Sequence, residues 1–261
     1  MKEMGSIDSL SLWLIYLLTV GLGLLAVEIG YHLGRYWKQR NPEEQESHTG
    51  AMVAATLGLW AFLLAFLVGA STNRFDARRE LVAEEANAIG TTYLRAGYLP
   101  ETYATRSREL LREYAGLRVQ LVELSSFAAA RQHSEQIQPM LWSMAQELAA
   151  TQPANPVLAL YVDTLNQTID LHTLRIAALT TSRIPSSIYA GMYVVAFLGL
   201  LMLGYQSGIN GNRNLIATLV LILIFSAIML LIIDLDRPWG GVLRVSQQPL
   251  IDLIGSLSTF K

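Results

Sequence analysis

Four long apolar stretches dominate the pattern of hydrophobic and polar positions along the chain. They cover residues 12–33, 51–70, 187–205 and 215–233, and the third is rich in tyrosine. A helix rises about 1.5 Å per residue, so roughly 20 apolar residues are needed to cross the hydrocarbon core of a bilayer. The pattern therefore predicts four transmembrane helices.

Residues 71–186, between the second and third stretches, have a different character. Charged residues become dense there, and apolar residues recur at the spacing of a helix face. No strand pattern of comparable strength occurs, so we expect a helical aqueous domain and an all-α fold. The four predicted stripes are Val82, Ala86, Ile89 and Tyr93; Leu110, Tyr114, Leu117, Leu121 and Leu124; Ile137, Leu141, Met144 and Leu148; and Val157, Tyr161, Leu165, Thr168, His172, Ile176 and Leu179.

Proline and glycine mark the predicted helix boundaries. Gly97 to Pro100 separates the first two helices of the aqueous domain, and Asn155 before Pro156 is typical of an N-cap followed by proline at the first helical position. Further helix starts are predicted near Pro139 and Pro185. Because no proline or strong breaker follows the second apolar stretch, its helix is expected to continue unbroken into the aqueous domain.

The chain is thus predicted to have four parts. These are a transmembrane hairpin in residues 1–70, the helical aqueous domain in 71–186, a second hairpin in 187–234, and a C-terminal turn with an amphipathic helix in 235–261. Apolar residues of the last part share one helix face, and Pro249 lies near its start. They are Leu250, Leu253, Ile254 and Leu257.

The composition is typical of a membrane protein and excludes several kinds of site. The chain is 52% hydrophobic and 15% charged, against about 25% charged residues in a typical soluble domain. The net charge of -2 gives no basic surface for nucleic acid, and the absence of cysteine excludes disulfides, thiolate metal sites and cysteine nucleophiles. With no catalytic motif in the sequence, we expect no enzyme, no cofactor and no metal.

An even number of spans places both termini and the helical domain on one side of the membrane. The positive-inside rule counts Lys and Arg close to the helix ends. These residues are more numerous on the domain side, so the termini and the helical domain are predicted to be cytoplasmic. The domain side has Lys2, Arg74, Arg78, Arg79, Arg183, Arg237 and Arg244, and the other side has Arg35, Lys38, Arg40 and Arg213.

Two sets of charged residues near the ends of the spans have competing interpretations. Glu28 and His32 are four residues apart and share a helix face, which makes them either a functional site within the membrane or an interfacial or interhelical pair. Asp234 and Asp236 could contribute to a calcium site, but calcium takes six to eight oxygen ligands. A structural cluster with Arg237 is the interpretation that we favour.

The second apolar stretch is the most informative of the four. It carries no charge and combines alanine and glycine with aromatic residues, among them Phe62 and Phe66, which are one helical turn apart. Small residues allow close helix packing, whereas an apolar ring around an axis can gate a pore by dewetting. The pore-lining candidates are Gly58, Phe62, Phe66, Ala70 and Asn73.

A charged patch follows this stretch directly. Such a patch is commonly a solvated helix face, but it could also be a vestibule that concentrates ions at a pore mouth. The vestibule candidates are Arg74, Arg78, Glu84 and Glu85.

Two stretches of the sequence resemble a known family. The run from Asn73 to Arg95 (NRFDARRELVAEEANAIGTTYLR) and the C-terminal run DRPWGG, followed by VSQQPL, are similar to bacterial proteins described as bestrophin-like. The motif candidates in the second stretch are Asp236, Arg237, Pro238, Ser246, Gln247, Gln248 and Pro249.

The resemblance implies a location in the bacterial inner membrane and, more distantly, a relation to bestrophins. Bestrophins are pentameric anion channels with a cytosolic helical domain between the second and third of four membrane helices. Their pore neck would fall on Phe62, Phe66 and Ala70. Ala70 is smaller than a neck residue, and Ala77 and Arg78 stand where bestrophins carry a tryptophan pair.

Two functions from different classes follow from these observations. The first is a homo-oligomeric ion channel in the lipid membrane, with residues 51–70 lining the pore. The resemblance to bestrophins implies that it is a pentamer and conducts chloride-like anions. The alternative is a non-conducting membrane scaffold or sensor whose helical domain binds a partner.

Overall fold

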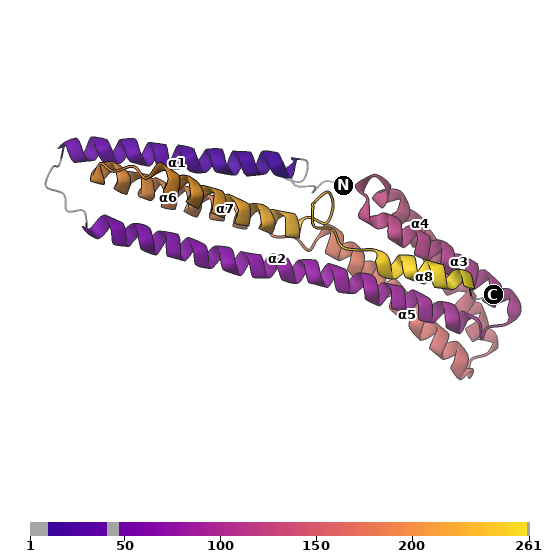
Figure 1. Ribbon diagram of the computed structural model, residues 1–261. Coiled ribbons are helices and arrows are strands. Elements are labelled where there is room, and N and C mark those ends of the chain that lie inside the picture. The colour runs from indigo at the N-terminus through magenta and orange to yellow at the C-terminus, as the bar shows by residue number, and fades with distance from the viewer. Residues whose placement is uncertain (1–9, 41–46, 260–261) are drawn as a thin grey trace. The chain divides into compact units, whose positions relative to one another are not determined.

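The computed structural model describes residues 10–40 and 47–259, and in these ranges the regular structure is helical throughout (Figure 1). Four of the helices are long and apolar enough to cross a membrane. The prediction of an all-α fold with four candidate spans is confirmed for this part of the chain. Lys2, used in the orientation argument, lies outside the described residues. The elements are α1 (Leu12–Arg40), α2 (Ser47–Ala96), α3 (Glu101–Val119), the 3-10 turn η1 (Gln120–Val122), α4 (Leu124–Thr151), α5 (Pro156–Thr180), α6 (Ser186–Asn210), α7 (Leu215–Asp236) and α8 (Gln248–Thr259).

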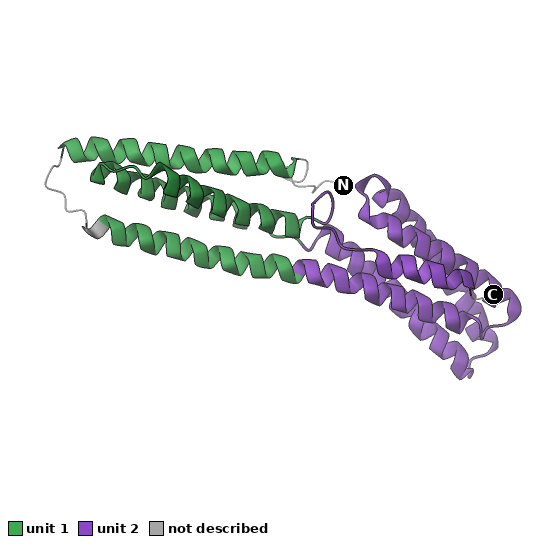
Figure 2. Cartoon of the chain, in the orientation of Figure 1, with its two compact units in different colours: residues 1–73, 183–237 green, residues 74–182, 238–261 purple. Residues whose placement is uncertain are grey.

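The helices form two compact units (Figure 2). The first unit comprises the chain up to residue 73 and residues 183–237, and it contains the four candidate spans. The second comprises residues 74–182 and the chain from residue 238 onward, and it contains α3, α4, α5 and α8. α2 contributes its first half to one unit and its second half to the other.

α2 is a single helix of 50 residues. The expected continuity of the second apolar stretch with the charged run after it is therefore confirmed. Residues 47–96 contain no proline, and the charged part from Arg74 to Glu80 is rich in residues with high helix propensity.

In the first unit, α1 and α6 lie side by side and pack through glycines (Figure 1). A Cβ atom built at Gly30 or Gly34 would come closer than 3.0 Å to backbone atoms of α6, and one built at Gly204 or Gly208 would meet the backbone of α1 in the same way. Glycine is thus required at all four positions. The sequence had drawn attention to small residues in 51–70, whereas the closest backbone contacts in this unit are made by α1 and α6.

The pair Glu28 and His32 belongs to an ionic cluster between elements of the first unit. The Glu28 carboxylate accepts a hydrogen bond from Arg213, which lies between α6 and α7, and His32 Nε2 lies 3.0 Å from its other oxygen. The Arg213 guanidinium also stacks 4.0 Å from the centre of the Tyr31 ring. Of the two interpretations, the interhelical pair is the one that the geometry supports.

The second unit has a core built from the predicted stripes. Ile89, Tyr93 and Tyr161 are almost completely buried in it, whereas Leu124 and Val157, the end residues of two predicted stripes, are 48% and 37% exposed, so their assignment to the core was wrong. The C-terminal helix α8 adds Leu250 and Leu257, which are 0% and 2% exposed.

In the second unit, one helix start predicted from proline is confirmed and another is wrong. Asn155 caps α5, since its side chain accepts hydrogen bonds from the amides of Val157 at 2.9 Å and Leu158 at 3.3 Å, as predicted. Pro139, by contrast, lies inside α4 and does not start a helix. Pro139 and Glu135 are exposed, so water can bind the Glu135 carbonyl that loses its amide partner, and α4 continues.

Candidate functional site

One face of α2 in the first unit is left uncovered by the chain's own helices. Phe62 and Phe66 are 68% and 73% exposed, and a Cβ atom at Gly58 would meet nothing within 4 Å. The opposite face packs tightly, with Trp60 and Leu64 each 2% exposed. The face with small residues and phenylalanines therefore has no packing partner within the described part of a single chain.

Polar residues continue the helical register of this face toward the C-terminal half of α2. Asn73 is exposed at the end of the first unit, and Ala70, one turn earlier, is half-buried. In the second unit Asp76, Glu80 and Glu84 follow at four-residue spacing, and all three are exposed. The exposed face of α2 thus changes from apolar to acidic along the helix.

The four vestibule candidates do not share one surface. Glu84 is exposed and Arg74 is half-buried, whereas Arg78 is 5% exposed and Glu85 is 0% exposed. The charged patch predicted from the sequence therefore separates into an exposed acidic row and a set of buried ionic residues.

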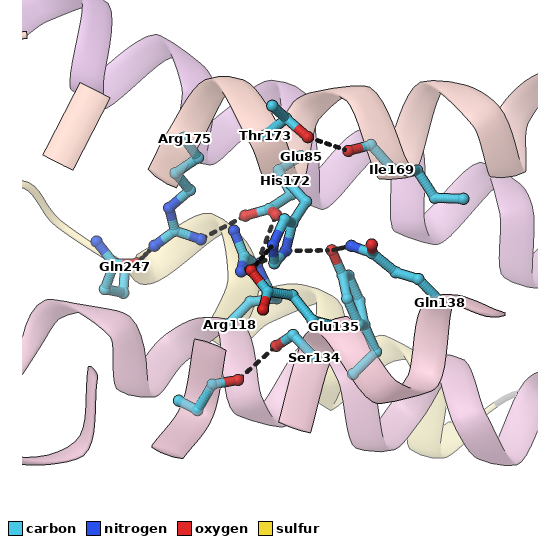
Figure 3. Close-up of polar contacts among 12 residues, drawn as sticks. Glu85, Arg118, Ser134, Glu135, Gln138, Ile169, His172, Thr173, Arg175 and Gln247 are labelled. Atoms are coloured by element: carbon cyan, nitrogen blue, oxygen red, sulfur yellow. Dashed lines mark hydrogen bonds and ion pairs between the residues drawn. The ribbon is translucent and has the colours of Figure 1, made fainter. Parts of the chain in front are cut away.

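Glu85 is the centre of the buried set (Figure 3). Its Oε1 accepts a hydrogen bond from Nε of Arg118 on α3 at 2.6 Å, and its Oε2 accepts one from Nη1 of Arg175 on α5. Both arginines are buried, at 0% and 3% exposed. One carboxylate thus joins three helices of the second unit and faces two guanidinium groups.

His172 completes the network as a neutral side chain. Nη1 of Arg118 lies 2.9 Å from its Nδ1, and because guanidinium is only a donor, Nδ1 must be the acceptor and Nε2 carries the proton. Burial, reinforced by the nearby Arg118 charge, lowers the pKa of His172 to about 4. With His172 neutral, the buried part of the network has two arginines for one glutamate, and the half-exposed Glu135 carboxylate lies 3.7 Å from His172 Nε2.

Burial also raises the pKa of Tyr114, a neighbour of His172, to about 12. The phenol therefore stays protonated near neutral pH, and it contributes no negative charge to balance the two arginines.

The C-terminal motif contributes to both units. In the second unit, Gln247 Oε1 accepts a hydrogen bond from Nη2 of Arg175, and its Nε2 donates to the Val245 carbonyl at 3.0 Å. The Ser246 hydroxyl accepts from the Gln248 amide at 3.2 Å at the start of α8, whose first turn includes Pro249.

In the first unit two motif residues bind backbone groups of the segments that precede α6 and α1. The Asp236 carboxylate accepts from the Ile184 amide at 3.1 and 3.3 Å, just before α6, and lies 3.9 Å from Nε of Arg183. Arg237 donates to the Leu10 carbonyl at 3.0 Å. The interpretation of Asp236 and Arg237 as a structural cluster agrees with these contacts, and no group of three or more His, Asp or Glu side chains that could hold a metal ion occurs in residues 10–40 and 49–259.

Arg118 and Arg175 were missed as candidates in the sequence. The signal was nevertheless present, because each falls on a predicted apolar stripe: Arg118 is four residues after Tyr114, and Arg175 is three after His172. A charged residue at a core position of an amphipathic helix indicates a buried ion pair, although the pattern does not identify its partner.

Comparison with known proteins connects this architecture to a family. A family model described as "Bestrophin-like domain" matches residues 20–250. A search of curated proteins found no match. Among solved structures, a bacterial Bestrophin homolog from Klebsiella pneumoniae carrying a point mutation has a TM-score of 0.68 at 16% identity, covering 95% of this chain and 98% of that chain. Another structure of that homolog has a TM-score of 0.65 at 17% identity, covering 94% of this chain and 99% of that chain.

Proposed function

The chain belongs to the bestrophin-like family, and we propose that it forms a homo-oligomeric ion channel in which the exposed face of α2 surrounds the pore. The observation that carries the proposal is the exposure of Phe62 and Phe66 beside glycines that have no neighbour. Phenylalanine rings from several copies, one helical turn apart, would form an apolar constriction of the kind that gates by dewetting.

The composition of this face favours an axis over lipid. α1 and α7 expose large hydrophobic residues, such as Trp13 at 76% and Ile216 at 78%, and bulky side chains suit contact with acyl chains. The α2 face instead offers Gly58, Gly69 and several alanines, which allow helices of different copies to approach closely. A single α2 cannot enclose a pore, so the proposal requires an oligomer, and five copies is the number that the resemblance implies.

Two classes of ion are candidates. Chloride-like anions are implied by the resemblance to bestrophins. Cations are favoured by a specific observation: the exposed charges that follow the neck in the register of α2 are Asp76, Glu80 and Glu84, with Arg79 as an exposed cation in the same stretch. Carboxylates at a pore mouth raise the local concentration of cations. The reversal potential under a KCl gradient separates these two possibilities.

The absence of cysteine allows a direct test of the pore. Phe66→Cys introduces one thiol, and a charged, water-soluble methanethiosulfonate should react with it and change ion flux in liposomes if the side chain faces an aqueous axis. Leu17→Cys on α1, where the native side chain is 63% exposed, is the matched control, because a lipid-facing thiol does not react. Flux equal to that of empty liposomes in several salts would reject the channel and favour the alternative, a scaffold or sensor whose helical domain binds a partner.

The orientation belongs to the same proposal. We place the termini and the helical domain in the cytoplasm of a bacterial cell, with the spans in the inner membrane, on the count of basic residues near the helix ends. Tyr98→Cys in the second unit and Arg35→Cys at the end of α1 are both exposed positions. An impermeant thiol reagent added to intact spheroplasts should label only the thiol introduced at position 35.

A further inference from the structure

The second unit contains a cavity that the channel proposal does not use. It has a volume of about 110 Å³, whereas a single water molecule needs roughly 10–15 Å³ of such volume. The space is therefore large enough for several waters or for one small polar ligand. α2, α5 and the segment before α8 contribute to its walls.

Positive charge dominates the lining of this cavity. Arg78, Arg175 and Arg244 face it, with Glu123 as the acidic residue in the lining. Arg78, Arg175 and Gln247 are each more than nine-tenths buried, so the inner end of the cavity is both cationic and shielded from solvent. A charge in such a place interacts more strongly than at the surface, because screening by water is reduced.

The ionic network behind the cavity adds to this positive potential. Arg175 shares the buried Glu85 carboxylate with Arg118, so the buried part of the network has two guanidinium groups for one carboxylate, and Glu135 contributes its carboxylate at the exposed side, 3.7 Å from His172. Nη2 of Arg118 is buried without a hydrogen-bond partner. Buried charge is tolerated when it is compensated, and an anion in the adjoining cavity would supply that compensation.

The walls give the cavity a fixed shape. The Trp239 side chain donates from Nε1 to the Leu121 carbonyl at 3.1 Å, and its ring meets the edge of Phe127 at a centroid distance of 5.1 Å. Val82 and Leu179 provide apolar surface on the sides. Arg244 and Glu123 are exposed, so they mark the solvent-facing rim.

We infer that this cavity is a binding site for a small oxyanion, namely inorganic phosphate or a short carboxylate. Planar guanidinium groups match the paired oxygens of such anions and bind them bidentately. Arg78 and Arg175 act at the closed end, Arg244 at the rim, and Glu123 opposes entry. The site is independent of ion conduction, since α2 contributes to it through the buried face and not through the exposed one.

Rim residues allow a test that leaves the core intact. An anion that binds only the folded state raises the unfolding temperature, and the stabilisation grows with the logarithm of one plus the ratio of ligand concentration to Kd. The full chain in detergent is heated at a series of phosphate or acetate concentrations, with chloride replaced so that ionic strength stays constant. Wild type, Arg244→Gln and Glu123→Gln are compared. The matched controls are Arg106→Gln and Glu109→Gln on α3, whose side chains are 52% and 54% exposed and which do not line the cavity.

For wild type we expect an unfolding temperature that is unchanged well below Kd and rises with the logarithm of anion concentration above it. Arg244→Gln should raise the apparent Kd roughly tenfold, since it removes a charge-assisted contact, and Glu123→Gln should lower the apparent Kd. The two controls should match wild type. If phosphate binds and acetate does not, the ligand is a phosphate, and the reverse result identifies a carboxylate. No rise in unfolding temperature with either anion, or the same concentration dependence in wild type and Arg244→Gln, would overturn the assignment.

Discussion

Glu85 shows how a single residue can connect much of the second unit. It lies on the core side of α2, and each of its oxygens accepts a hydrogen bond from a different arginine. Replacing a buried ion pair with well-packed apolar groups is often harmless, but removing one partner leaves the other charges buried without compensation. Glu85 is therefore important because its loss would leave Arg118 and Arg175 buried without a counter-charge.

Glu85→Gln should destabilise the protein strongly. Two buried guanidinium groups would then lack a counter-charge, and breaking a buried pair in this way costs about 3–5 kcal/mol. Thermal unfolding of the detergent-solubilised protein, followed by tryptophan fluorescence, measures the loss. Glu84→Gln, one residue earlier and exposed, should change stability by less than about 0.5 kcal/mol. Equal effects of the two substitutions would contradict the network.

His172 should make stability depend on pH. Its pKa in the folded chain is about 4, below the ordinary value of 6.5, so between these values the unfolded chain binds a proton that the folded chain does not. Stability should therefore fall as the pH is lowered from about 6.5 to about 4, by at most about 1.4 kcal/mol per pH unit from this group. The unfolding temperature of His172→Gln should fall less steeply over that range than wild type, whereas that of His133→Gln, exposed on α4, should follow wild type. Parallel curves for wild type and His172→Gln would reject this assignment.

At the scale of elements, the two glycine-containing helix faces of the first unit serve different purposes. Gly30 and Gly34 on α1, with Gly204 and Gly208 on α6, allow the two backbones to touch. At Gly58 on α2, an added Cβ would meet nothing within 4 Å among the described residues. The same residue type thus indicates packing within the chain in one place and an uncovered surface in another.

The same substitution should therefore give opposite results on the two helices. Gly30→Ala forces a Cβ atom against the backbone of α6 at Leu201, and because backbone cannot rotate away, we expect a loss of at least 1–3 kcal/mol and little monodisperse protein. Gly58→Ala places a methyl group in open space and should leave the unfolding temperature of the detergent-dissociated single chain near that of wild type. Fluorescence-detected size-exclusion chromatography and thermal unfolding compare the pair. Similar behaviour of both variants would argue against close α1–α6 packing.

For the molecule as a whole, the proposed channel requires several copies of the chain. The face of α2 that is exposed in one chain would become an enclosed surface in an oligomer, with phenylalanines along the membrane part and carboxylates beyond it. In the proposed channel, Asp76, Glu80 and Glu84 would set the charge of that surface and so the class of ion that gathers at its mouth.

Neutralising the acidic row should change ion selectivity. In the variant Asp76→Asn, Glu80→Gln, Glu84→Gln, the cation-to-anion permeability ratio is expected to fall about tenfold, because local cation enrichment by the carboxylates is lost. Reversal potentials in planar bilayers under a KCl gradient measure the ratio. Neutralising Glu109 and Glu113 on α3, both exposed, provides the control. An unchanged ratio in the triple variant would place the row outside the ion path.

Much of the fold and part of the candidate site could be read from the sequence. The spans follow from the length of apolar runs, α2 follows from the absence of proline, and the cap of α5 follows from Asn155 and Pro156. All of these depend on interactions within about one helical turn, or on transfer of a continuous segment into lipid. The exposure of Phe62 and Phe66 could only be suggested, since periodicity identifies a helix face but not the surface that covers it.

Contacts between residues far apart in the sequence became known from the three-dimensional structure. Glu85, Arg118, Arg175 and Gln247 are widely separated in the sequence and come together because three helices and the segment before α8 fold onto one core. The structure also shows that the glycines required for close packing lie on α1 and α6. It shows too that the charged patch seen in the sequence consists of an exposed row and a buried network. The sequence by itself determined the helices and their apolar faces, because those depend on local propensity and hydropathy. The pairing of the faces, and the burial of charge that results, depend on contacts between residues far apart in the chain, which no local pattern specifies.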